Sequence, residues 1–435
     1  MKRSKKLLKY LAFFGILSVQ IIFFQATNLS GSAEISGSIE SNNYLILKTG
    51  KIDTARINLN LKFEESQQRY HFFAELNLNS TIPTSISDLS NLSSPSTVMP
   101  LSTTLNEAYL DIFQFPIGII DMRLGKQIIV WGTADKLNPT ANLCPSDLRD
   151  IFNFGEKIGI TAIKFDLYPG PLQIEGVVVP YFNPSPLPEN FAELSGAQLG
   201  RTHIEMPDEY LGENIQFGLK TSWFIGNYDF SLSYYYGRYW VPVAYRVDLS
   251  GTYTVDDTYM FFPKVQVAGF DFTGSLENVG TWGELAVFIP EEYSLTTIVS
   301  GIPVGSEEKS DICTRYVLGA DYTFSDGTYI NTQFAHGLDF ENQKDLIKDY
   351  LMLRLEKSFL NDKIKVHPIT LFATTGDIDN IKNNYGLGYI PEIQIFPSDN
   401  TELNIGAVLL EGKGNNLITN IEKRDSLYIE FKVSF

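Results

Sequence analysis

Apolar and polar residues alternate with a period of two along most of the chain. Residues 55–63 place Ala, Ile, Leu, Leu and Phe at every second position, with Arg, Asn, Asn and Lys between them. Residues 351–355 likewise place leucine at three alternate positions. Successive side chains of a β-strand point to opposite faces, so each such segment predicts a strand with one apolar and one polar face. Long amphipathic helical patterns are missing, and the chain is therefore expected to be all-β.

The segments predict eighteen strands, with sixteen as the alternative number. The expected strands are 34–48, 51–63, 69–79, 104–113, 118–131, 156–168, 171–181, 212–224, 226–240, 259–273, 278–289, 312–325, 328–337, 348–359, 362–374, 382–396, 400–412 and 424–435. Their connections mostly alternate between short turns and long loops. This is typical of a transmembrane antiparallel β-barrel with short periplasmic turns and long extracellular loops, and an even strand number suits one. A soluble sandwich has no reason to place every long loop at one end.

Two positions break the alternation. Lys126 falls on the apolar face of its strand, which predicts either a side chain near the outer interface or a bulge at Gly125. The apolar phase also switches near Pro368. A bulge is expected there because proline cannot donate to the strand ladder.

The N-terminal residues predict a secretion signal. Five basic residues precede an apolar run from Tyr10 to about Phe24, and Gly31-Ser32-Ala33 offers a small-residue cleavage site. The expected organisation is a cleaved signal peptide at 1–33 and an outer-membrane barrel at 34–435. Cleavage after Ala26 and an uncleaved anchor are the alternatives.

The last predicted strand ends on an aromatic residue. Residues 427–435 place apolar side chains at every second position and finish on Phe435. This pattern resembles the terminal strand that the outer-membrane barrel assembly machinery recognises. The resemblance implies that machinery and outer-membrane lipid as partners of a multi-pass protein of the cell outer membrane. A homotrimer is one assembly compatible with this interpretation.

The chain is acidic, with 34 Lys and Arg residues against 51 Asp and Glu residues and a net charge of -17. An acidic chain is a poor ligand for nucleic acid, so no nucleic-acid partner is expected. Acidic groups in a lumen would favour cations over anions. The alternative is that they keep the extracellular loops solvated.

No motif in the sequence indicates catalysis. The four histidines have no zinc-type spacing, and neither a Gly-x-Ser-x-Gly elbow nor a phosphate-binding glycine loop is present. No enzyme, metal or cofactor is therefore expected. A barrel hydrolase whose Ser-His-acid site is assembled from wall residues remains an alternative, because sequence spacing cannot show such a site.

Polar residues gather on the inward face of two neighbouring predicted strands and in the loop that follows them. The residues expected to line the pore or its constriction are Glu107, Tyr109, Asp111, Asp121, Arg123, Gln127, Trp131 and Asp135. A three-residue turn at 114–116 would place Glu107 opposite Arg123, and a turn two residues longer would place Tyr109 there. Such pairs either tune the selectivity of a pore or brace its wall.

The loop at 132–155 is the third predicted external connection. In general porins the third loop folds into the barrel and narrows it, and this loop resembles it in position. Trp131 and Gly132 would form the bend, with an outer aromatic girdle as the alternative place for Trp131. A disulfide between Cys144 and Cys313 would pin the loop across the lumen, and two free thiols are the alternative.

The segment Gly125-Lys126-Gln127, followed by Trp131-Gly132 and Asn138-Pro139, resembles a segment of porin-like outer-membrane families of the alginate-export and substrate-specific types. Lys126 stands where those families usually carry arginine, which removes bidentate recognition. The resemblance implies a porin-like channel. Together with the barrel pattern and the position of the third loop, it predicts a channel for passive diffusion of small hydrophilic solutes, with the loop at 132–155 as its constriction. A barrel hydrolase and a closed structural or adhesive surface barrel are the alternatives.

Overall fold

A computed structural model of the chain describes residues 33–47, 50–81, 86, 88–92, 94–115, 117–149, 155–188, 191–192, 197–208, 211–375 and 380–435. The predicted signal peptide lies outside these residues, apart from Ala33 at the start of the first strand. Within the described ranges, no helix is both long and apolar enough to span a membrane.

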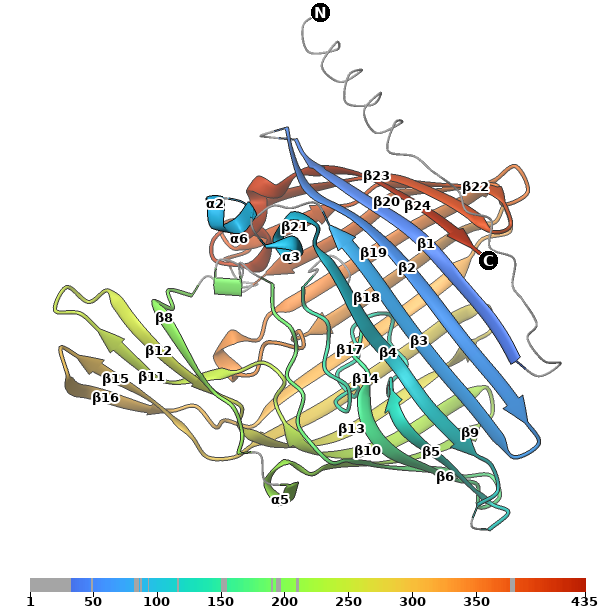
Figure 1. Cartoon of the computed structure of the whole chain (residues 1–435), viewed down its shortest axis with the longest axis horizontal. Coiled ribbons are helices and arrows are strands. Elements are labelled where there is room, and N and C mark those ends of the chain that lie inside the picture. Colours follow the sequence, from blue (N-terminus) through green and yellow to red (C-terminus); the bar gives the residue numbers. More distant parts are fainter. Residues whose placement is uncertain are drawn as a thin grey trace, which may run out of the picture.

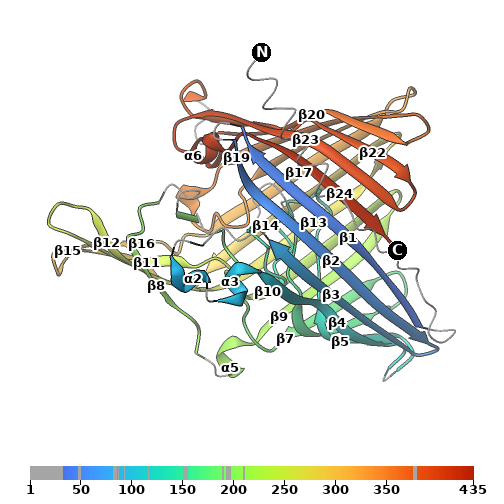
Figure 2. The same ribbon diagram turned by 45° about the horizontal axis from the view of Figure 1, so that its top comes forward.

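Nineteen strands of the described residues form one antiparallel sheet that closes as a barrel, because β1 pairs with β24 (Figure 1; Figure 2). β21 and β22 both pair with β20 and β23, so the two occupy one interrupted position in the wall. The wall therefore has eighteen strand positions, and the prediction of an all-β, eighteen-strand antiparallel barrel is confirmed. The barrel strands are β1 (Ala33–Ile46), β2 (Lys51–Gln67), β3 (Tyr70–Thr81), β4 (Leu101–Ile112), β5 (Ile120–Gln127), β6 (Ile160–Leu167), β7 (Gln173–Val179), β9 (Gln216–Ile225), β10 (Tyr228–Arg238), β13 (Lys264–Leu276), β14 (Val279–Pro290), β17 (Cys313–Thr323), β18 (Thr328–His336), β19 (Asp349–Phe359), β20 (Ile364–Thr375), β21 (Tyr385–Tyr389), β22 (Glu392–Ser398), β23 (Thr401–Lys413) and β24 (Ser426–Ser434).

Three long connections contribute a second sheet that the sequence did not predict. It projects from one end of the barrel, at the lower left of Figure 1. Its strand order is β16-β15-β11-β12-β8, and the β11–β15 and β12–β8 pairings are parallel. The strands are β8 (Arg201–Glu205), β11 (Val243–Leu249), β12 (Val255–Phe261), β15 (Ser294–Val299) and β16 (Ile302–Glu308). The described helices are α2 (Leu89–Leu92), α3 (Pro95–Val98), α5 (Leu211–Asn214), α6 (Leu417–Ile421), η1 (Lys344–Leu346) and η3 (Glu422–Arg424).

Strand β14 shows how the period-two pattern builds the wall. Leu285 and Ile289 are exposed on the outer face, whereas Glu284, Ala286 and Phe288 are buried on the inner face. Large exposed apolar residues recur on the outer faces of other wall strands, as expected of a barrel whose exterior is apolar. The inner face is thus the side on which polar side chains have protein partners.

The expected bulge near Pro368 is present. The β19–β20 register shifts between Leu355 and Lys357, so one extra residue of β20 lies opposite the shift. Beyond this point β20 stops pairing with β22 and begins to pair with β21. A residue without a backbone N–H fits such a break in the ladder.

Candidate functional site

Asp111 on β4 and Arg123 on β5 form an ion pair on the inner wall. The two residues are opposite each other in the ladder, and Arg123 Nε donates to Asp111 Oδ1 at 2.6 Å. The predicted partners of Arg123, Glu107 or Tyr109, are therefore wrong, although the expected acid–base pairing of the two strands is present. Asp111 is 6% exposed.

The register differs from the prediction because the β4–β5 turn is longer than expected. Gln114 has a positive φ of 57°, and its backbone N–H donates to Asp121 Oδ1 at 2.8 Å. The Phe115 N–H donates to the Ile120 carbonyl at 2.8 Å. Asp121 thus caps the turn and is not part of the inner-wall cluster.

Other predicted residues surround the Asp111–Arg123 pair. The Arg123 guanidinium lies 3.9 Å from the Tyr109 ring centre, and His71 Nδ1 is 2.9 Å from Asp111 Oδ2. Glu107 accepts a hydrogen bond from the Ile128 N–H at 2.7 Å. These residues form a wall cluster on β3, β4 and β5. Through Glu107 and Ile128 the cluster contacts the segment just before the loop at 132–155.

Gln127 and Trp131 hold the chain in place where it leaves β5. Gln127 is fully buried, and its Nε2 donates to the Ala162 carbonyl at 3.0 Å. Trp131 is 2% exposed, and its indole N–H donates to Glu175 on β7. Trp131 thus packs inside the barrel, and an outer aromatic girdle is not its place. Its ring covers Gly218, where a β-carbon would lie 2.5 Å from the Trp131 ring.

The carboxylate of Glu284 on β14 binds the first part of the loop through hydrogen bonds. Its Oε1 accepts from the Thr133 and Ala134 N–H groups, both at 2.7 Å, and from Asn138 Nδ2 at 2.9 Å. Its Oε2 accepts from the Thr140 N–H at 3.1 Å and from the Thr140 hydroxyl at 2.8 Å. Five donors on one buried carboxylate form a charge-assisted anchor.

Gly132 lets the loop reach this anchor. Its φ is +95°, and a β-carbon there would lie 2.4 Å from Glu284 Oε1. Asn138 also donates to the Ala134 carbonyl at 2.9 Å, which closes the turn around the carboxylate. The Trp-Gly and Asn-Pro parts of the sequence motif therefore bend one segment around one acid.

The same loop reaches β18. Gln333 Oε1 accepts from the Asp135 N–H at 3.1 Å, and Gln333 Nε2 donates to the Asp135 carbonyl at 2.9 Å. Asp135, predicted from sequence as a pore residue, is therefore held through its backbone. The loop leaves β5 and contacts β14 and β18, which lie well around the wall in the order of paired strands.

A second polar contact joins the loop region to the connection between β18 and β19. Lys157 Nζ donates to Ser146 Oγ at 2.8 Å and to Asp339 Oδ2 at 3.1 Å, and its side chain is 3% exposed. The Ser146 hydroxyl donates to Asp339. Burial alone would raise the pKa of Asp339, but the Lys157 and Ser146 contacts outweigh burial and hold the pKa below its ordinary value.

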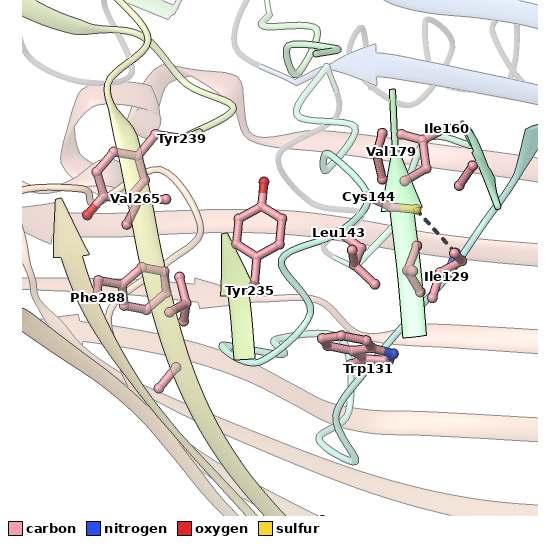
Figure 3. Close-up of a cluster of buried hydrophobic side chains, with 14 of the residues drawn as sticks. Ile129, Trp131, Leu143, Cys144, Ile160, Val179, Tyr235, Tyr239, Val265 and Phe288 are labelled. Carbon is pink, nitrogen blue, oxygen red and sulfur yellow. Dashed lines mark hydrogen bonds between the residues drawn. The ribbon is translucent and has the colours of Figure 1, made fainter. Parts of the chain in front are cut away.

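Apolar side chains of the loop region complete a buried cluster with the inner wall (Figure 3). Cys144 belongs to it, and its Sγ accepts from the Ile129 N–H at 3.2 Å. Cys144 and Cys313 both belong to this cluster and are free thiols, so the predicted disulfide is wrong. Burial raises the pKa of Cys144 to about 11.

Lys126 points outward, one residue before β5 ends. It pairs with Thr161, whose neighbours Ile160 and Ala162 are the buried, inward residues of β6. Its Nζ donates to the Leu105 carbonyl at 2.5 Å. A register shift in the β3–β4 ladder at this level leaves that carbonyl accessible, and Lys126 satisfies it.

Sequence reasoning missed Glu284, Gln333, Lys157 and Asp339. Glu284 carried a usable signal, since it is the one charged residue between Val279 and Pro290 and alternates with apolar inward neighbours. Gln333 carried no comparable signal. In the described part of the chain, no group of three or more His, Cys, Asp or Glu side chains could hold a metal ion.

Comparison with known proteins gives a likeness of fold. No family model matches the chain, and no curated protein matches it by sequence. Among solved structures, the chain is similar to Acinetobacter baumannii OccAB3, with a TM-score of 0.51 and 9% identity over 93% of this chain and 98% of that chain. Pseudomonas aeruginosa OccK11 (OpdR) gives a TM-score of 0.49 at 8% identity over 93% of this chain and 96% of that one. Salmonella typhi OmpF, in complex with daunomycin, gives 0.42 at 8% identity over 94% and 100% of the two chains.

Proposed function

We propose that the chain is an outer-membrane channel for passive diffusion of small hydrophilic solutes, with the loop at 132–155 as its constriction. The observation that carries the proposal is the anchor on Glu284. A carboxylate on the inner wall that accepts five hydrogen bonds from residues 133–140 supports a loop folded into the barrel. The wall cluster of Asp111, Arg123 and Tyr109 would then line the passage beside it.

The outer face of the barrel supports a location in the outer membrane. Exposed apolar side chains at alternate positions suit lipid contact, and a closed wall leaves no unpaired strand edge in a membrane. β24 and the residue after it complete the closure, since the Phe435 N–H donates to the Gly37 carbonyl at 2.9 Å. Recognition of this strand by the barrel assembly machinery, and a homotrimeric state, are parts of the same proposal.

Conductance of the refolded protein in planar bilayers tests the channel. Wild type is expected to give discrete channels. Glu284→Ala should give larger and noisier ones, because five loop donors lose their acceptor, at a cost of at least about 2 kcal/mol. Glu430→Ala is the matched control, since Glu430 is a carboxylate on β24 that accepts from Tyr44 on the neighbouring strand β1. An absence of channels in wild type and in Glu284→Ala would refute the proposal.

A closed surface barrel is the second candidate, and the apolar packing of the interior favours it. Two buried clusters lie inside the wall, one around Trp131 and Cys144 and one around Tyr350 and Phe372. If these clusters leave no path, wild type will not conduct, whereas Glu284→Ala will conduct once the loop is released. Conductance measured for both wild type and Glu284→Ala therefore distinguishes an open channel from a closed barrel.

A further inference from the structure

A cavity of about 130 Å³ lies inside the barrel, beside helix α6. We name it the α6 cavity. It is bounded by α6, by the Asp135–Lys136 part of the loop and by the inner faces of β18, β19, β20 and β21. α6 lies at the same end of the barrel as β21, with which it is in contact (Figure 1).

The cavity forms where the wall is interrupted. β20 pairs with β22 through Ile364–His367 and with β21 through Leu371–Thr374, and the backbone between these ladders includes Pro368. Gly388 on β21 adds no side chain, and a β-carbon there would meet nothing closer than 3.5 Å. The space is therefore left open by the strand break rather than by loose packing of large residues.

The lining of the α6 cavity is mainly apolar. Its apolar lining residues are Met352, Leu353, Leu371, Phe372, Ile390, Leu417, Ile418 and Ile421. A dry apolar cavity of roughly 150 Å³ can hold one benzene ring, so the α6 cavity matches a ligand with a single ring. Pockets of this kind bind by burying an apolar body while a few polar groups fix its orientation.

The polar lining residues are Asp135, Lys136, Asn331, Gln333, Arg354 and Thr370, and Arg354 is the one that we assign to orient a ligand. Gln333 cannot, because its amide is already bonded to Asp135 and Trp282. Arg354 lines the cavity and its side chain is 40% exposed. Its Nε donates to His367 at 3.1 Å and its Nη2 to Glu356 at 3.3 Å. The guanidinium has five N–H donors, so some remain for a ligand oxygen.

The charges around the cavity favour a neutral oxygen over an anion, because Asp135 and Lys136 in the lining carry opposite charges. Glu356 already neutralises the guanidinium, and Glu392 adds a second carboxylate 3.9 Å from His367. An incoming carboxylate would meet these negative charges, whereas a hydroxyl or carbonyl oxygen would accept a hydrogen bond without that penalty.

We propose that the α6 cavity is a binding site for small neutral monocyclic aromatic compounds that carry one hydroxyl or carbonyl oxygen, as phenols do. The ring packs against Met352, Phe372 and the α6 side chains, and the oxygen accepts from Arg354. The inference rests on the proposed channel function, because the solute reaches the cavity through the lumen.

Binding of 4-fluorophenol to the refolded protein, followed by ¹⁹F NMR, tests the site. Wild type should broaden the signal saturably, and excess phenol should reverse the broadening, which partition into detergent would not allow. Met352→Trp fills the cavity, so the ring of the ligand loses its packing contacts. Binding should weaken at least about tenfold. Ile312→Trp is the matched control, since Ile312 is 59% exposed and does not line the cavity.

A second variant keeps the test decisive if Met352→Trp does not fold. Ile421→Ala enlarges the cavity and should admit 6-fluoro-2-naphthol, which wild type should exclude. Channels in bilayers without saturable binding of 4-fluorophenol would overturn the site and leave the channel intact. Binding without channels would support the site and refute the channel. Tighter binding of the anion 4-fluorobenzoate than of 4-fluorophenol would overturn the proposed preference for neutral ligands.

Discussion

At the scale of single residues, Gly132 and Glu284 act as one unit. The positive φ of Gly132 and the 2.4 Å approach of its missing β-carbon to Glu284 Oε1 mean that the loop can reach the carboxylate only through glycine. The anchor therefore depends on a residue without a side chain as much as on the acid itself.

We expect Gly132→Ala to reproduce the conductance of Glu284→Ala. The substitution adds backbone strain of about 1–3 kcal/mol and pushes the loop away from the carboxylate. The double variant Gly132→Ala/Glu284→Ala should equal either single variant, because both remove the same anchor. Gly170→Ala is the control, since Gly170 has a φ of +69° but free space around its β-carbon. Additive effects of the two substitutions would contradict the shared anchor.

The two cysteines give a second prediction at this scale. With a pKa of about 11, Cys144 is almost wholly protonated at pH 8 and should not react with a thiol reagent in the native protein. Cys313 is 3% exposed and should also be protected. Val304→Cys, at a position 61% exposed, supplies a reactive control. Unfolding without reductant should release two reactive thiols, whereas a disulfide would release none.

At the scale of elements, the wall strands are predictable because their signal is local. Each strand carries its own period-two pattern, so all eighteen positions can be found without knowing their partners. The register between two strands is not local in this way. It depends on turn length, and the bonds from Gln114 to Asp121 and from Phe115 to Ile120 lengthen the β4–β5 turn beyond the expectation.

The projecting sheet lacks that local signal. Every residue of β8 and β16 is exposed, so neither strand has a buried face to impose alternation. Its strands come from three separate loops and pair partly in parallel, which sequence spacing does not reveal. The residues of the candidate site likewise fall into a predictable and an unpredictable group. Residues at the β5 exit were predictable, whereas Glu284 and Gln333 meet the loop across 151 and 198 positions of sequence.

At the scale of the whole molecule, apolar packing and acidic charge have different consequences. The apolar clusters pack the described part of the loop against the inner wall, and this packing carries no charge that would distinguish one ion from another. The excess of 51 acidic over 34 basic residues acts on the sign of an ion. Its field reaches only about 10 Å in 0.1 M salt and about 3 Å in 1 M salt.

We therefore expect wild-type channels to prefer potassium over chloride, with a preference that declines as salt rises. Reversal potentials in asymmetric KCl measure the permeability ratio, first near 0.1 M and then near 1 M. Glu307→Gln/Glu308→Gln is the control, since both residues lie exposed on β16 in the projecting sheet, and their neutralisation should leave the ratio unchanged. A preference for chloride would show that local basic groups such as Arg123 control the passage. A preference for potassium that does not change with salt would place its origin in buried carboxylates rather than in exposed charges along the passage.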